Sequence, residues 1–327
     1  MIRYSPILLL LLLIAASCGK KSETTSTPAA SVEVPKFNAD SAYAFVQKQV
    51  DFGPRIPNTE PHRKTAAWLE SKLKSYGAHV TVQSFRAQTV DGTIAELKNI
   101  VASFNPEKQK RILLASHWDT RPYASKDPVN KTAPFDGAND GASGVGVLLE
   151  VARQLQSMKP RAGVDIVLFD GEDWGSEADP SVVPAPPQGY SAWWSLGSQY
   201  WSKNLHKPGY RAHFGILLDM VGAPDARFFK EGTSMEYAPG IVNKVWSAAT
   251  ILGYGDFFIS QDAQGLTDDH LFVNENAKIP MIDIVQYNNQ TGFGSFHHTT
   301  GDNMNVINRR TLNAVGSTVL YVVFQEE

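Results

Sequence analysis

The chain has 327 residues, 43% of them hydrophobic and 19% charged, which is the composition of an ordinary globular enzyme with a substantial buried core. Its net charge of −3 argues against nucleic acid as a partner. The only cysteine, Cys18, excludes an intramolecular disulfide, so packing of the core must hold the fold together.

The first residues have the three parts of a secretory signal peptide. Arg3 provides a positive charge, residues 7–14 are apolar, and residues 15–17 are small. The apolar run is much shorter than the roughly 20 residues that a membrane-spanning helix needs. We therefore predict a signal peptide over residues 1–17 rather than a membrane helix.

The position of Cys18, directly after these small residues, resembles the lipobox of bacterial lipoproteins. Ala15 stands where that box usually has leucine, which is a mild departure. The resemblance implies cleavage before Cys18, acylation of its sulfur and anchoring to membrane lipid. Gly19 is not acidic, which favours the outer membrane, with the protein facing the periplasm. The alternative is a plain secretory signal with an incidental cysteine.

Residues 18–36 are rich in Ser, Thr, Ala and Pro, and we expect them to form a flexible tether that begins at the lipidated Cys18. No internal repeat or second linker follows, so residues 37–327 are predicted to form a single catalytic domain. This domain begins with two helical patterns, followed by two alternating stretches that suit half-buried antiparallel strands. The expected helices are residues 40–50 and 61–76, and the expected strands are residues 79–85 and 95–104.

Four apolar runs further along the chain have the pattern of strands buried on both faces. Amphipathic helical patterns lie between them. Alternation of buried strand and helix predicts the α/β class, as a three-layer α/β/α sandwich around a mixed, mostly parallel sheet. The runs are residues 112–115, 164–169, 216–220 and 279–285, and the helices include residues 145–155 and 241–252.

Acidic and histidine residues lie at or after the ends of these runs. Ligands of such sheets bind beyond the carboxyl ends of the strands, so we expect these side chains to meet at one edge. Like charges so close together would raise each other's pKa unless a cation neutralised them. Mixed carboxylate and imidazole ligands favour a transition metal, most commonly zinc; a purely structural polar network is the alternative. The residues are His117, Asp119, Asp140, Asp170, Glu172, Asp173, Asp219, His297 and His298.

Five motifs at these positions resemble those of the M28 zinc aminopeptidases and of their relatives, the animal-type (type II) glutaminyl-peptide cyclotransferases. Any one motif is weak, but all five occur in the family's order, and the resemblance covers most of the chain from about residue 40 onward. The motifs are Ser116–Asp119, Asn139–Gly144, Phe169–Asp173, Asp268–His270 and His298–Asp302.

The resemblance implies a metal site and a catalytic group. Asp140, Asp173 and His298 correspond to the ligands of the catalytic zinc, and Glu172 corresponds to the general acid/base. Asp173 is a glutamate in the animal enzymes, so the ligand is shorter by one methylene and needs a compensating backbone shift.

The resemblance also implies roles for other polar residues. In the cyclotransferases, which hold one zinc, the counterparts of Asp219 and Asp268 belong to a hydrogen-bonded acid network. In the two-zinc aminopeptidases, His117 and Asp219 would hold a second metal. His117 can also be a structural partner of its neighbouring aspartate, and for His270 we expect a structural role at the start of a helix.

The segment of residues 174–196 favours the cyclotransferases over the aminopeptidases. It is long and proline-rich, and it resembles their tryptophan-containing insertion. We expect Trp193 or Trp194 to pack on the substrate; the alternative is that both form the core of the insertion.

His297 stands where the animal enzymes place a tryptophan beside the zinc histidine. We expect His297 to contact the substrate, although stacking there is in doubt. The choice between His297 and His298 as the metal ligand also stays open at this point. The family's Thr-x-x-Asp pattern after the ligand favours His298.

The implied reaction converts the N-terminal glutamine of peptides or proteins to pyroglutamate and releases ammonia. One zinc ion would act as Lewis acid, while Glu172 would move a proton. The alternatives are an aminopeptidase with two zinc ions and a non-catalytic lipoprotein that binds zinc or peptides. A serine nucleophile is not supported, because the chain has no Gly-x-Ser-x-Gly elbow.

Overall fold

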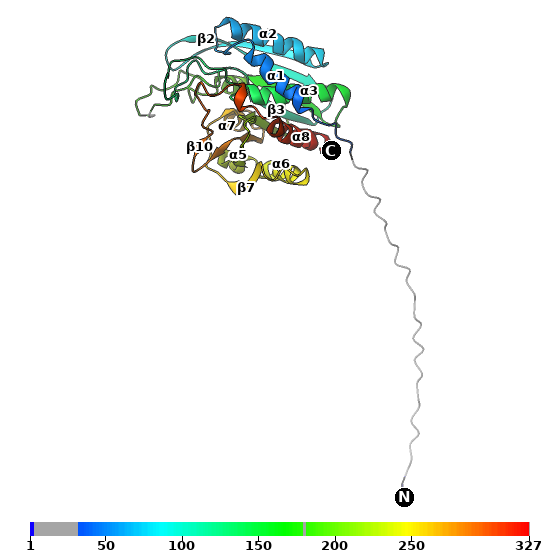
Figure 1. The fold of residues 1–327 in the computed structure, drawn as a ribbon. Helices are drawn as coiled ribbons and strands as arrows, with labels where there is room; N and C mark the ends of the chain where they lie inside the picture. Colours follow the sequence, from blue (N-terminus) through cyan, green and yellow to red (C-terminus); the bar gives the residue numbers. More distant parts are fainter. Residues whose placement is uncertain (3–31, 179–180, 327) are drawn as a thin grey trace. The chain divides into compact units, whose positions relative to one another are not determined.

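The computed structural model describes residues 1–2, 32–178 and 181–326. Its centre is a six-stranded sheet in the order β1-β2-β4-β3-β5-β8 (Figure 1). β2 pairs antiparallel with β1 and β4, and the other three pairs are parallel. This mixed, mostly parallel sheet confirms the predicted fold class. The strands are β1 (His79–Gln88), β2 (Ile94–Phe104), β3 (Arg111–His117), β4 (Gly163–Phe169), β5 (Phe214–Asp219) and β8 (Met281–Val285).

The four strands predicted to be buried on both faces are buried at every residue, which accounts for their mostly apolar sequences. Helices therefore cover both faces of the sheet. The eight helices of the described residues are α1 (Ala39–Val50), α2 (Glu60–Ser75), α3 (Ala142–Ser157), α4 (Leu196–Lys203), α5 (Gly232–Tyr237), α6 (Pro239–Ile251), α7 (Asp269–Phe272) and α8 (Arg309–Gln325).

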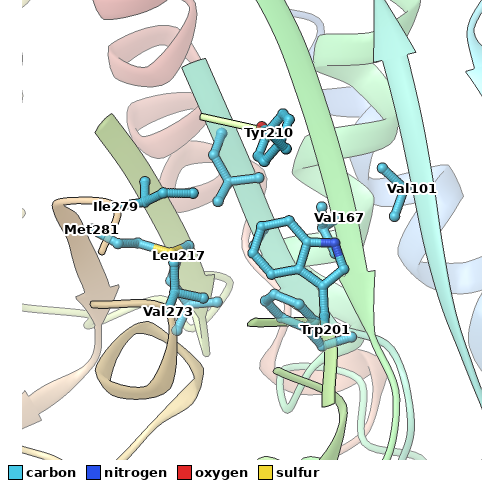
Figure 2. Close-up of a cluster of buried hydrophobic side chains, with 11 residues drawn as sticks. Val101, Val167, Trp201, Tyr210, Leu217, Val273, Ile279 and Met281 are labelled. Atoms are coloured by element: carbon cyan, nitrogen blue, oxygen red, sulfur yellow. The ribbon is translucent and has the colours of Figure 1, made fainter. Parts of the chain in front are cut away.

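Alternation of side chains along the strands separates the two faces. Leu113 and Leu217 point to the core cluster that contains Trp201 of α4 (Figure 2). Ser116 and Leu218 lie on the opposite face, where α3 approaches so closely that a Cβ on Gly144 would lie 2.3 Å from the Leu218 carbonyl oxygen. α1 and α8 contact α3 and complete that layer.

A smaller sheet in the C-terminal half has the order β10-β9-β6-β7. Its strands were not predicted, because they are only two to five residues long and show no clear alternation of apolar and polar residues. α8 was also not predicted, since its many Val and Thr residues are more typical of strands. The strands are β6 (Phe228–Lys230), β7 (Phe258–Asp262), β9 (Tyr287–Asn288) and β10 (Gly292–Phe293); a π-helix (Val273–Ala277) and a 3-10 helix (Met304–Val306) complete the fold.

Residues 33–327 form one compact unit. The predicted signal peptide, Cys18 and most of the tether lie outside the described residues. No helix in the described ranges is both long and apolar enough to cross a membrane.

Candidate metal centre and active site

The carboxyl ends of the parallel strands and the loops that follow them surround a cavity of about 480 Å³. His117 and Asp219 are the last residues of β3 and β5. Glu172 and Asp173 follow β4, and Asp140 lies just before α3. The site is thus at the edge of the sheet where the sequence placed it. The cavity is lined by Lys126, Asp140, Glu172, Asp173, Glu177, Ala192, Trp194, Asp219, Met220, Leu266, Thr267, Asp268, Phe293, His297 and His298.

Two buried carboxylates lie close to one imidazole nitrogen in this cavity. His298 Nε2 is 3.1 Å from Asp173 Oδ1 and 3.6 Å from Asp140 Oδ2. Asp173 Oδ2 is buried without a hydrogen-bond partner among the described residues. Two carboxylates and an imidazole are a donor set that zinc binds, and a cation would also satisfy the unpartnered oxygen. The chemistry of these three residues therefore suits a zinc ion; the trio whose ligand atoms all lie within 4.8 Å of one another contains His297 in place of Asp173.

The other ring nitrogen of His298 is held by a carboxylate that the sequence did not suggest. Nδ1 lies 2.5 Å from Glu177 Oε1, and the Lys126 main-chain N–H donates to the His298 carbonyl oxygen. His298 has a φ of 57°, in the left-handed region that non-glycine residues seldom occupy. Burial lowers the pKa of His298, but Asp173 and Glu177 outweigh this and raise it to about 9. The two carboxylates therefore stabilise a positive charge on the His298 imidazole.

His297 lies beside His298 and is held differently. Lys126 Nζ is 2.9 Å from His297 Nδ1, and the His297 ring packs 4.3 Å from the ring of Phe293. Burial, followed by the neighbouring His298, lowers the pKa of His297 to about 2, so the ring is neutral. An ammonium can only donate, so Nδ1 accepts and the ring proton lies on Nε2. Asp140, His297 and His298 are close enough to share an ion, but this tautomer favours His298 as the ligand.

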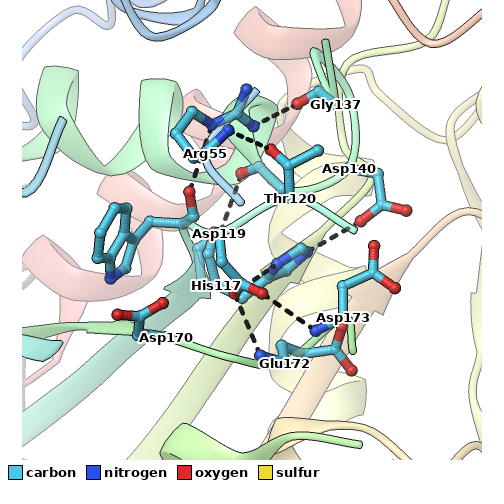
Figure 3. Close-up of polar contacts among 12 residues, drawn as sticks. Arg55, His117, Asp119, Thr120, Gly137, Asp140, Asp170, Glu172 and Asp173 are labelled. Carbon is cyan, nitrogen blue, oxygen red and sulfur yellow. Dashed lines mark hydrogen bonds and ion pairs between the residues drawn. The ribbon is translucent and has the colours of Figure 1, made fainter. Parts of the chain in front are cut away.

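Two buried groups hold the loop that carries Asp140. The Arg55 guanidinium donates to the carbonyl oxygens of Gly137, at 2.7 Å, and of Asp136 (Figure 3). The Asp302 carboxylate accepts the main-chain N–H groups of Asn139 and Asp140, at 2.7 and 3.1 Å. Asp140 is therefore positioned before any metal binds.

A second cluster adjoins the first. His117 Nε2 lies 3.0 Å from Asp140 Oδ1 and 3.2 Å from Asp219 Oδ1. Burial lowers the pKa of His117, but hydrogen bonds to Asp119, Asp140 and Asp219 outweigh it and raise the pKa well above its usual value. A protonated His117 supplies positive charge here, and the same three side chains His117, Asp140 and Asp219 are close enough to hold a second cation.

Glu172 is fixed through its backbone, and its carboxyl group lines the cavity. The Asp119 carboxylate accepts the main-chain N–H groups of Glu172 and Asp173, at 3.1 and 3.2 Å (Figure 3). Ser195 Oγ donates to Glu172 Oε1 at 3.2 Å. Burial, with additional repulsion from Asp268, raises the pKa of Glu172 well above its usual value. A carboxyl group with a raised pKa is suited to exchange protons near neutral pH.

Comparison with protein-family models identifies residues 99–323 as Peptidase family M28. The chain is a member of this family. The match covers more than half of the chain and includes every residue of the cavity wall.

Solved structures extend the similarity of this M28 protein to almost the whole chain. Bacteroides thetaiotaomicron glutaminyl cyclase bound to N-acetylhistamine is 49% identical, with a TM-score of 0.85 over 90% of this chain and 100% of that one. Porphyromonas gingivalis glutaminyl cyclase is 51% identical, with a TM-score of 0.82 over 88% and 97%. A Zn-dependent exopeptidase from Parabacteroides distasonis is 49% identical, with a TM-score of 0.85 over 90% and 100%. The predicted resemblance to M28 peptidases and glutaminyl cyclotransferases is confirmed.

The insertion of this M28 protein places one of its two tryptophans in the cavity wall. The Trp194 ring lies nearly parallel to the His298 ring, with centroids 6.1 Å apart. Trp193 does not line the cavity, and its indole N–H donates to the Pro184 carbonyl oxygen at 2.7 Å. Of the two tryptophans that the sequence offered for substrate contact, the geometry therefore favours Trp194.

Two of the predicted strand-end acids support the site from outside the cavity. Asp170 pairs with His62 Nε2 at 2.9 Å and accepts the Lys98 main-chain N–H. Asp119 holds the backbone of Glu172 and Asp173. Both acids follow predicted strands, as do several acids of the cavity wall. Position along the sequence therefore could not distinguish acids that line the cavity from acids that only support it.

Sequence reasoning missed Arg55, Lys126 and Glu177. Arg55 lies in a turn between α1 and α2, far along the chain from the loop that it holds. Glu177 belongs to an insertion without periodicity, so no pattern predicted its position. The only sequence signal for Glu177 was its place in a proline-rich segment shortly after Asp173, a proposed metal ligand.

Proposed function

We propose that this chain is a zinc-dependent glutaminyl cyclase that acts on peptides or proteins with an N-terminal glutamine. The observation that carries the proposal is the placement of Glu172 in the wall of the same cavity as Asp140, Asp173 and His298 and as the acids Asp219 and Asp268. Identities of 49% and 51% to two bacterial glutaminyl cyclases support the same activity.

The reaction requires one proton transfer and a substrate conformation that brings the α-amine close to the side-chain carbonyl carbon. The α-amine attacks the side-chain carbonyl carbon of glutamine, a new C–N bond forms, and the amide C–N bond breaks. Glu172 accepts a proton from the α-amine and donates it to the leaving nitrogen, which departs as ammonia. Asp140, Asp173 and His298 would hold zinc, which supplies Lewis-acid polarisation of the carbonyl group when bound.

Asp219 and Asp268 would keep the proton on Glu172 available for transfer. Burial, opposed by a hydrogen bond from His117, raises the pKa of Asp219 to about 7. Asp268 lies close enough to raise the pKa of both Glu172 and Asp219. Trp194 would exclude water and help to hold the glutamine side chain near its own amine.

One rival activity has an observation in its favour. The cluster of His117, Asp140 and Asp219 could hold a second metal, as a two-zinc aminopeptidase would require. Purified protein should therefore be incubated with a Gln-initiated peptide and, separately, with a Leu-initiated one. Loss of ammonia from the first peptide, with the second untouched and about one zinc per chain, is the expected result. A freed N-terminal amino acid with two zinc ions would identify an aminopeptidase instead.

We also propose that Cys18 carries a lipid that anchors the protein to the outer membrane, facing the periplasm. The support is the signal-like leader, the small residues before Cys18 and the Ser/Thr/Pro-rich stretch after it. In a cell that processes lipoproteins, the wild type should enter the detergent phase and incorporate labelled fatty acid. Cys18→Ala should remain in the aqueous phase without label; equal partitioning of both proteins would contradict the anchor.

A further inference from the structure

Glu177 makes four polar contacts around the proposed metal ligand His298. Its Oε1 lies 2.5 Å from His298 Nδ1 and 3.0 Å from Lys126 Nζ. Its Oε2 accepts a hydrogen bond from Ser125 Oγ at 2.6 Å and lies 4.0 Å from the Arg121 guanidinium. The Glu177 side chain is 24% exposed, whereas the His298 side chain is 4% exposed. The carboxylate is thus fixed on the solvent side of the imidazole.

This contact determines which nitrogen of His298 faces the other ligands. A carboxylate can only accept, so the proton of the His298 ring lies on Nδ1. Nε2, which lies 3.6 Å from Asp140 and 3.1 Å from Asp173, is then the nitrogen that would give up its proton when a cation binds. Metal-binding histidines commonly donate their second ring N–H to a carboxylate, which fixes the tautomer and increases the basicity of the ligating nitrogen.

We infer that Glu177 is the positioning residue for His298, holding its imidazole in the tautomer and orientation that bind zinc. Glu177 belongs to the same insertion that places Trp194 in the cavity wall. The insertion therefore does more than shape the substrate cavity, because it also supplies the group that prepares the metal site. The inference depends on the proposed zinc site but not on the cyclisation reaction.

Zinc affinity measured without substrate tests this inference. Metal-free wild type and the variants Glu177→Ala and Glu177→Gln are titrated with zinc in competition with a chromogenic chelator. We expect Glu177→Ala to bind zinc roughly 10- to 100-fold more weakly. Glu177→Gln should lose less, because its amide oxygen can still accept from Nδ1. The d–d absorption of the cobalt(II) forms should change in Glu177→Ala.

Ser125→Ala is the matched control, since it removes a different hydrogen bond from the same carboxylate. It should keep wild-type zinc affinity and an unchanged cobalt spectrum. Zinc affinity of Glu177→Ala within about twofold of the wild type, or equal losses in Glu177→Ala and Ser125→Ala, would overturn the inference. Neither outcome involves turnover, so a failure here is distinct from a failure of the cyclase proposal.

Discussion

At the scale of single residues, Glu172 and the proposed metal ligands have separable tasks. The backbone of Glu172 is held by Asp119, which is not one of the proposed ligands. Glu172→Gln should therefore retain zinc but lose about 100- to 10,000-fold in kcat, because a neutral amide cannot take the proton from the α-amine. Zinc content and ammonia release, measured on the same preparation, check both parts.

Glu236→Gln is a suitable comparison for that variant, because Glu236 is exposed on α5 and lies outside the cavity wall. It should keep both zinc and turnover. Unchanged turnover in Glu172→Gln would remove Glu172 from its assigned role, whatever its zinc content.

The types of residue in the site could be predicted, but their fine positions could not. Asp173 and Asp219 follow or end apolar runs, Asp140 lies just before the helix that comes after the first run, and the topology of a parallel sheet brings such positions together. The tautomers of His297 and His298 depend on Lys126 and Glu177, which lie in loops that no periodicity places. Trp193 and Trp194 are adjacent and identical in type, so only the fold of the insertion distinguishes them.

At the scale of elements, the close approach of α3 to the sheet depends on a glycine. A Cβ at Gly144 would lie 2.3 Å from the Leu218 carbonyl oxygen and 2.4 Å from Ser116 Oγ. Gly144→Ala should push the N-terminal end of α3 away from β3 and β5, with a loss of about 1–3 kcal/mol in the free energy of unfolding. Urea denaturation of the metal-free protein measures that loss directly.

Gly240→Ala in α6 is the matched substitution, because a Cβ there would meet nothing within 4 Å. Its free energy of unfolding should equal that of the wild type or exceed it by up to about 1 kcal/mol, since alanine favours helix more than glycine. If Gly144→Ala were as stable as Gly240→Ala, the proposed contact between α3 and the sheet would be incorrect.

Of the two tryptophans in the insertion, only Trp194 should affect substrate binding, because only Trp194 lines the cavity. Trp194→Ala removes the ring that lies in the cavity wall, and we expect kcat/KM to fall roughly tenfold, or about 1.4 kcal/mol. Trp193→Phe removes the indole N–H that donates to Pro184 and part of the ring, both outside the wall of this cavity, so kcat/KM should stay within about twofold of the wild type. Steady-state kinetics with one Gln-initiated peptide compares the two, and a larger effect from Trp193→Phe would contradict this assignment.

The strands of the large sheet could be predicted, while those of the small sheet could not. β3, β4, β5 and β8 have mostly apolar sequences because both of their faces are covered. The small sheet of β6, β7, β9 and β10 depends on pairing between distant segments. Its shortest strands contain two residues, too few for any period.

At the scale of the whole molecule, Glu231 links several segments of the C-terminal half. Its carboxylate accepts the main-chain N–H groups of Thr233, Ser234 and Leu266, each at 2.6–2.7 Å. It also lies 3.0 Å from His270 Nε2, which gives His270 the structural position at a helix start that the sequence suggested. This single buried acid therefore joins β6, α5, α7 and the loop before α7.

These contacts make stability depend on pH in a defined direction. Burial alone would raise the pKa of Glu231, but hydrogen bonds from His270 and Ser234 outweigh it and lower the pKa from 4.5 to about 2. A group whose pKa is lower in the folded protein stabilises the fold at pH values above its unfolded pKa. That contribution, on the order of 3 kcal/mol, should disappear as the pH falls from about 4.5 to about 2.

Glu231→Gln removes this ionisation and tests its sign. At pH 7 the metal-free variant should unfold at a lower urea concentration than metal-free wild type, and the gap should narrow as the pH approaches 2. Glu236→Gln, on the exposed side of α5, should follow the wild type at every pH. A constant gap between pH 7 and pH 2 would mean that Glu231 stabilises the fold by packing and uncharged hydrogen bonds, because only an ionised carboxylate gives a contribution that acid removes.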